Sequence, residues 1–141
     1  MSAAEPKQNP TPYELLGGQR ALFCLVERFY ALMDREPEYF AVRKLHPDDL
    51  TNSRDKLFMF LSGYLGGPPL YQQSIGNPML RARHLPFPIG KAERDAWLAC
   101  MRRALDDAQV EPPELRDWLM QQFFGTADWM RNKEGDMPGQ P

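Results

Sequence analysis

The positions of the prolines constrain the fold of this chain more than any other feature of the sequence. The chain has 14 prolines in 141 residues. A proline inside a helix removes a main-chain hydrogen bond and clashes with the preceding turn. The prolines therefore divide the chain into segments, and the four long proline-free stretches that remain are 13–36, 48–67, 89–111 and 114–137. Each of them has room for a helix of several turns.

Each of these stretches shows the apolar spacing of an amphipathic helix, in which apolar residues recur three and four positions apart. Within 19–35 the spaced residues are Leu22, Val26, Phe29 and Met33. Within 49–64 they are Leu50, Ser53, Leu57, Phe60, Leu61 and Tyr64. Within 91–108 they are Trp97, Met101, Ala104 and Ala108. In a fourth helix that begins at Pro112 and Pro113, the row is Leu115, Leu119, either Gln122 or Phe123, Thr126 and Met130. No stretch alternates apolar and polar residues, so the sequence predicts an all-α fold.

The length and composition are those of one globular domain that spans 1–141. Hydrophobic residues make up 43% of the chain and charged residues 26%, which is enough apolar material for one core. Residues 1–10 and 132–141 are polar and contain proline or glycine, so we expect flexible tails there.

Charge and cysteine usage exclude several classes of partner. The net charge of -2 argues against nucleic acid binding. The apolar runs are too short for a membrane span, and the first ten residues lack the apolar centre of a signal peptide. Cys24 and Cys100 are far apart and form neither a disulfide framework nor a metal motif. We expect a cytoplasmic monomer or homodimer without nucleic acid or membrane partners.

Residues 68–90 form a connection that is longer than two neighbouring helices need. It is rich in apolar residues, and it contains Arg81, Arg83 and His84, the last being one of only two histidines. A long apolar connection with a histidine beside two arginines suggests a bound group with an apolar body and anionic edges.

No common enzyme motif is present: the chain has no GxSxG, HExxH or GxxxxGK[ST] pattern, and we assign no catalytic residue. His84 is either a structural histidine or an axial ligand to haem iron, which needs a neutral imidazole in an apolar wall. Arg81 and Arg83 are either surface charges or partners of haem propionates.

Three further residues stand out. Trp97 is either a core residue or a buried indole N–H that donates to a ligand. Tyr30 lies one position off the apolar row of its helix, which is typical of a boundary residue with its hydroxyl in water. His46 precedes Pro47 in a turn, which is typical of an exposed turn residue.

Three tracts taken in chain order resemble one family. The first is Gly17-Gly18, and the second is Leu57-Phe58-Met59-Phe60-Leu61-Ser62-Gly63-Tyr64-Leu65-Gly66-Gly67-Pro68-Pro69. The third is Arg81-Ala82-Arg83-His84-Leu85-Pro86-Phe87, followed by Glu93-Arg94-Asp95-Ala96-Trp97-Leu98. Over about residues 11–133 the chain is similar to the group II truncated haemoglobins.

The resemblance implies a truncated globin fold, a sandwich of two helices over two around haem b. His84 would be the proximal iron ligand. The other haem-binding residues would be Leu50, Leu57, Phe58, Met79, Arg81, Arg83, Phe87 and Trp97. On the distal side, the ligand-binding residues would be Tyr30, His46, Ser53, Leu57 and Trp97, with Ser53 where other globins carry the distal histidine.

The function that the resemblance implies is reversible binding of oxygen, and of nitric oxide, carbon monoxide or peroxide, at ferrous haem iron, as in oxygen transport. The first alternative is a haem-dependent redox enzyme that acts on nitric oxide or peroxide and depends on an external reductase. The second alternative is a helical interaction module without haem.

Overall fold

Four long helices and five short helical segments make up the part of the chain, residues 9–133, that this computed structural model describes. The long helices are α2 (Gly18–Arg35), α4 (Thr51–Tyr64), α7 (Lys91–Asp107) and α8 (Pro113–Trp129). The short segments are α1 (Pro12–Leu16), η1 (Pro37–Tyr39), α3 (Phe40–Arg43), α5 (Leu70–Ser74) and α6 (Leu80–His84). The described residues contain no strand, which confirms the all-α prediction.

Each long helix lies within one of the four proline-free stretches, except that α8 begins one residue earlier, at Pro113. Relative to the expected helix starts, the largest shift is at α4, which begins at Thr51 instead of position 49. The Asp49 side chain precedes the helix and accepts a hydrogen bond from the Thr51 N–H at 2.9 Å. Asp49 therefore satisfies one of the N–H groups that the first turn leaves without an internal partner.

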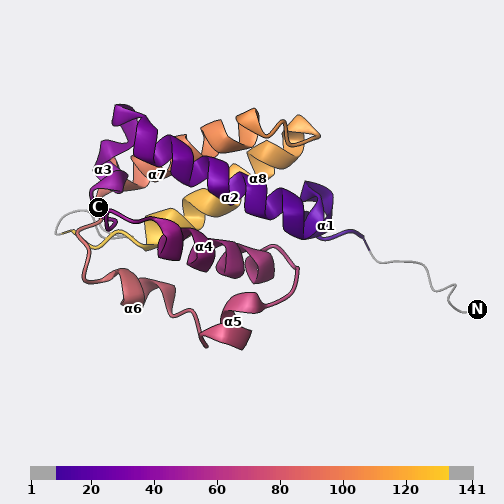
Figure 1. Ribbon diagram of the computed structural model, residues 1–141, viewed down its shortest axis with the longest axis horizontal. Helices are drawn as coiled ribbons and strands as arrows, with labels where there is room; N and C mark the ends of the chain where they lie inside the picture. The colour runs from indigo at the N-terminus through magenta and orange to yellow at the C-terminus, as the bar shows by residue number, and fades with distance from the viewer. Residues whose placement is uncertain (1–8, 134–141) are drawn as a thin grey trace, which may run out of the picture.

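The long helices form two pairs, as in a sandwich of two helices over two (Figure 1). Helix α2 contacts both α4 and α7, and α7 contacts α8. Helix α5 contacts α4, and Figure 1 shows α5 and α6 beyond α4 at one edge of the molecule. None of the described helices combines the length and apolar content needed to cross a membrane.

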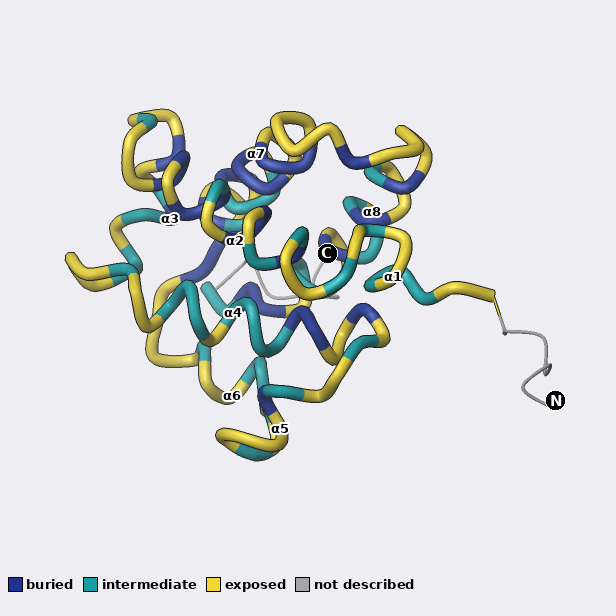
Figure 2. The backbone as a smooth tube through the Cα atoms, turned by 45° about the vertical axis from the view of Figure 1, so that its right-hand side comes forward, coloured by how far each residue is buried: buried dark blue, intermediate teal, exposed yellow. Residues whose placement is uncertain are grey.

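The core lies mainly between α2 and α7, where burial is greatest (Figure 2). The Cys100 side chain on α7 is fully buried and donates to the Phe29 carbonyl of α2 at 3.2 Å. Burial raises the pKa of the Cys100 thiol to about 12, so this side chain behaves as a small apolar residue. In contrast, the buried residues of α4 are only Leu61 and Ser62.

Two glycines allow the N-terminal segment to lie close to the core. Gly17 joins α1 to α2 with φ of 122°, and a Cβ there would lie 2.8 Å from the Ala21 Cβ. A Cβ on Gly67 would lie 2.5 Å from the Tyr13 ring. Larger residues would therefore push α1 away from the end of α4.

The connection 68–90 is more ordered than the sequence suggested, because it contains α5 and α6. Met79 precedes α6 in the left-handed region with φ of 45°, and this turn separates the two short helices. The connection thereby presents His84 from a helix and not from an irregular loop.

Candidate functional site

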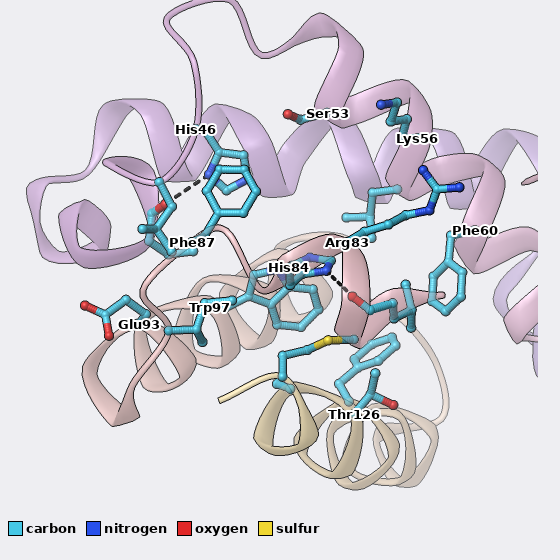
Figure 3. A pocket seen from close by; sticks show the side chains of 18 of the residues that line it. His46, Ser53, Lys56, Phe60, Arg83, His84, Phe87, Glu93, Trp97 and Thr126 are labelled. Atoms are coloured by element: carbon cyan, nitrogen blue, oxygen red, sulfur yellow. Dashed lines mark hydrogen bonds between the residues drawn. The ribbon is translucent and has the colours of Figure 1, made fainter. Parts of the chain in front are cut away.

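A cavity of about 520 Å³ lies between α4, α6, α7 and α8 (Figure 3). This volume falls within the range of roughly 300–1,000 Å³ that is common for small-molecule sites. Much of the lining is apolar: Val42, Leu45, Leu57, Phe60, Leu61, Leu80, Phe87, Ile89, Phe123 and Met130 contribute to it.

The cavity brings together predicted site residues from distant parts of the sequence. The predicted residues in its lining are Tyr30, His46, Ser53, Leu57, Arg83, His84, Phe87 and Trp97. On α4, Ser53, Leu57 and Leu61 follow each other at intervals of four, so they share one face of the helix. Ser53 and Leu57 are half-buried, because they line the cavity, whereas Leu61 is buried.

Four predicted residues lie outside the lining, and three of them are Leu50, Phe58 and Met79. Leu50 and Phe58 pack against the core beside α2, where the Phe58 ring meets Phe23 edge to face at 5.3 Å. Met79 is 56% exposed. Their roles toward a bound group stay predictions.

Arg81 is the fourth, and it is turned toward the end of α8. Its guanidinium donates to the main-chain carbonyl oxygens of Trp129 and Arg131 and lies over the Trp129 ring. Arg81 therefore ties α6 to the C-terminal end of α8, whereas its neighbour Arg83 lines the cavity.

His84 is oriented by its own helix. Its Nδ1 lies 2.7 Å from the Leu80 carbonyl oxygen, and a carbonyl only accepts hydrogen bonds, so Nδ1 carries the proton. In the neutral ring, Nε2 then keeps a lone pair that can bind a metal. Figure 3 shows the His84 ring within the cavity, close to Trp97. The Asn132 amide also donates to the His84 carbonyl at 3.2 Å.

His46 is held in the same way on the other side of the cavity. Its Nδ1 lies 2.9 Å from the Val42 carbonyl oxygen, so Nε2 is free in the neutral ring. Partial burial lowers the pKa of His46, and the charges of Arg43 and His84 act in the same direction, against the hydrogen bond to Val42. The imidazole is therefore mostly neutral near pH 7.

Tyr30 and Trp97 supply two further polar groups from α2 and α7. The Tyr30 ring meets His46 edge to face at 5.8 Å, and the Trp97 ring lies 5.0 Å from Phe29. Burial, with a smaller effect from Cys100, raises the pKa of Tyr30. Its hydroxyl therefore remains a neutral donor throughout the physiological range.

Basic side chains occupy one edge of the cavity. Lys56 and Arg83 are exposed to solvent and also line the cavity. Figure 3 shows both on the same side of it. Arg83 also donates to the Asn77 carbonyl at 3.4 Å. An anionic group at this edge would meet positive charge at the solvent boundary.

Sequence reasoning missed Lys56, Glu93 and Asn132. Lys56 lies one position before Leu57 and three after Ser53, so the helical spacing of α4 already pointed to it. Glu93 is 3% exposed and accepts from the Gly90 N–H at 2.8 Å and from Lys133. Asn132 and Lys133 belong to the expected flexible tail, whose remainder, 134–141, lies outside the described residues.

The donor set and the cavity fit a haem. One histidine presents an unshared Nε2 to an apolar space, and Lys56 and Arg83 stand at its edge. This combination suits a flat apolar ring with a central metal and two carboxylates. An all-α fold with this site defines a protein of the globin class.

The comparisons with known proteins agree with this class. The chain belongs to the bacterial-like globin family, whose model matches residues 11–132. It is 44% identical to group 2 truncated hemoglobin YjbI of Bacillus subtilis (strain 168), over 122 residues that cover 86% of this chain and 89% of that protein. Membership of this family implies a haem cofactor and haem-based ligand binding.

Solved structures show the same relationship. The group II 2-on-2 hemoglobin of Agrobacterium tumefaciens superimposes with a TM-score of 0.86 at 44% identity, covering 92% of this chain and 99% of that one. The group II truncated hemoglobin of Bacillus anthracis gives a TM-score of 0.83 at 42% identity, with coverage of 90% and 95%. The resemblance to group II truncated haemoglobins and the fold of two helices over two are therefore confirmed.

Proposed function

We propose that this protein binds oxygen reversibly at a ferrous haem b held by His84, with Tyr30, Trp97 and His46 as donors to the bound gas. The observation that carries this proposal is that all four side chains line one cavity. Bound haem supplies the iron that forms the reversible bond to a diatomic gas.

The proximal side of the site depends on α6. The Leu80 carbonyl fixes the His84 tautomer at 2.7 Å, which directs Nε2 toward the cavity and increases its basicity as a ligand. Arg83 and Lys56 would hold the two propionates at the exposed edge. The apolar lining excludes water from the space between the helices.

The distal side depends on hydrogen-bond donors in a water-poor space. Such donors stabilise partial negative charge on a ligand more than they would in water. A neutral hydrogen bond contributes about 0.5–1.5 kcal/mol, so removing one donor should accelerate release of the gas up to roughly tenfold. The small Ser53 side chain leaves room on the same side of the cavity.

A related structure supports oxygen as the ligand. The truncated haemoglobin of Bacillus subtilis with a TM-score of 0.79 is described as oxygen-avid, and several donors around one ligand are expected to produce slow release. A redox role toward nitric oxide or peroxide with an external reductase is the alternative outcome. The cytoplasmic location and the oligomeric state stay predictions from the sequence.

The test is the oxygen dissociation rate of the haem-loaded protein with Tyr30→Phe, Trp97→Phe and both changes together. We expect each single change to raise the rate about three- to tenfold, and the double change to be non-additive because both donors share one ligand.

Tyr13→Phe and Trp118→Phe are matched controls, since neither residue lines the cavity. Single-variant rates within twofold of the unchanged protein would refute the donor roles. Turnover of peroxide or nitric oxide with a cellular reductase extract, far above that of a haem-binding control protein, would favour the redox alternative.

A further inference from the structure

One arginine holds the turn that carries His46. Arg43 is the last residue of α3, and its side chain is 18% exposed. Its guanidinium donates to the main-chain carbonyl oxygens of three consecutive residues: His46 at 3.5 Å, Pro47 at 3.0 Å and Asp48 at 3.0 Å. The planar fork of five N–H donors allows one side chain to reach all three.

The same guanidinium is anchored to the helix that carries Tyr30. Its Nε donates to Asp34 Oδ1 at 3.0 Å. Asp34 lies four residues after Tyr30 on α2, so both share one face of that helix. The Arg43 side chain thus connects the helix that carries Tyr30 to the turn that carries His46.

This connection matters because the turn has little regular structure. No helix covers residues 44–50, and Pro47 has no N–H to donate. The His46 N–H bonds to the Arg43 carbonyl at 3.0 Å, which fixes the start of the turn only. The guanidinium fixes the carbonyl groups that follow, and so the backbone from which the His46 ring reaches the Val42 carbonyl at 2.9 Å and lies 5.8 Å from Tyr30.

We propose that Arg43 is a positioning residue that sets the place of His46 relative to Tyr30 and so tunes the release of the bound gas. This inference rests on the donor role of His46 in the proposed function. Arg43 is absent from the cavity lining, so it would act through His46 and without touching the gas.

The first measurement is backbone order in the haem-loaded protein saturated with carbon monoxide, by amide ¹⁵N relaxation of residues 45, 46, 48 and 49. In Arg43→Gln, we expect order parameters there to fall from about 0.85 to below about 0.6. Arg43→Lys should also lose order, because an ammonium group cannot span three carbonyls and a carboxylate. Arg35→Gln is the control, since Arg35 pairs with Glu36 at 3.1 Å and is not bonded to the turn.

The second measurement is a double-mutant cycle on the oxygen dissociation rate. Arg43→Lys should raise the rate about threefold in the unchanged background and less than 1.5-fold in His46→Phe, because coupled residues are non-additive. Equal effects in both backgrounds would overturn the proposal, as would unchanged order parameters in Arg43→Gln.

The failure of the proposed function is distinguishable from the failure of this inference. If Arg43→Gln disorders the turn while His46→Phe leaves the rate unchanged, Arg43 still positions the turn, but His46 is not a donor. Suppose instead that His46→Phe raises the oxygen dissociation rate, whereas Arg43→Gln disorders the turn and leaves the rate unchanged. His46 then keeps its place without Arg43, and the inference is wrong.

Discussion

The two histidines share one local arrangement. Each donates from Nδ1 to the carbonyl four residues earlier, Val42 for His46 and Leu80 for His84. Both rings therefore present Nε2 to the same cavity from different segments of the chain. The arrangement fixes the tautomer of each ring and leaves the second nitrogen to a ligand.

At the same scale, we predict that His84→Ala loses haem. His84 carries the one imidazole of α6, so haem retention should fall by more than tenfold, and added imidazole should restore part of it. The ratio of Soret to protein absorbance in the purified protein measures this. Ser53→Ala is the control in the same lining, and full haem content in His84→Ala would contradict the assignment.

The lowered pKa of His46 leads us to predict that the free energy of unfolding decreases in acid. Its pKa in the folded protein lies below the ordinary value of 6.5, so the unfolded state binds the proton more readily. The stability that the neutral ring contributes is therefore complete above pH 6.5 and is lost as the pH falls through the lower folded pKa. Denaturant unfolding between pH 8 and pH 5 should show a shallower decline in His46→Phe. Identical slopes in both proteins would refute this.

At the scale of elements, periodicity predicted the long helices because each repeats its apolar spacing over several turns. It missed the five short segments α1, η1, α3, α5 and α6, since segments of three to five residues are too short to show a period. Helix α1 had a local signal, the capping box of Thr11 and Glu14. Helix α6 depends on tertiary contacts, such as Arg81 bonded to the end of α8.

The candidate site was predictable where it lies on a long helix. The resemblance assigned Ser53 and Leu57 to the site, the spacing placed them on one face with Leu50, and only Ser53 and Leu57 of these three line the cavity. Lys56 was missed, although the same spacing includes it. Asn132 was not predictable, because its hydrogen bond to the His84 carbonyl joins positions 48 residues apart and no local pattern reports such a contact.

The start of α7 depends on one buried carboxylate. Glu93 caps the Gly90 N–H and pairs with Lys133 at 2.9 Å. Although burial raises its pKa, the hydrogen bonds from Lys133 and Gly90 lower it more. Glu93→Gln should keep the cap and lose the ion pair, at a cost of about 1–3 kcal/mol in unfolding free energy.

Glu27→Gln is the control, because Glu27 faces Arg54 at 3.9 Å on the surface and should change stability by less than about 0.5 kcal/mol. Urea unfolding of both variants measures the difference. A Glu93→Gln protein as stable as the control would show that the cap alone holds the helix.

At the scale of the whole molecule, the two halves of the fold differ in how they are stabilised. Helix α7 packs directly on both α2 and α8 around fully buried residues. Helices α4 and α6 instead face each other across the cavity. Because an empty apolar cavity loses both burial and contacts, the family's cofactor should act as part of the core.

Removal of haem should therefore destabilise one side of the molecule. A ligand present at 100 times its Kd stabilises a protein by about 2.7 kcal/mol, and we expect the melting temperature to fall by roughly 10 °C or more without haem. Calorimetry measures the shift, and hydrogen exchange should show the largest loss of protection in residues 70–90. Equal protection in both forms would contradict this view.

The hydrogen bonds from Arg43 to the turn also determine which positions of this protein can change over evolutionary time. The guanidinium recognises main-chain oxygens of residues 46, 47 and 48, and every amino acid carries such an oxygen. Substitutions at positions 47 and 48 should therefore accumulate with little effect on the site, whereas exchange of the arginine should loosen the turn. Relatives in which these two positions drift freely around an unchanged arginine would carry the signature of that constraint.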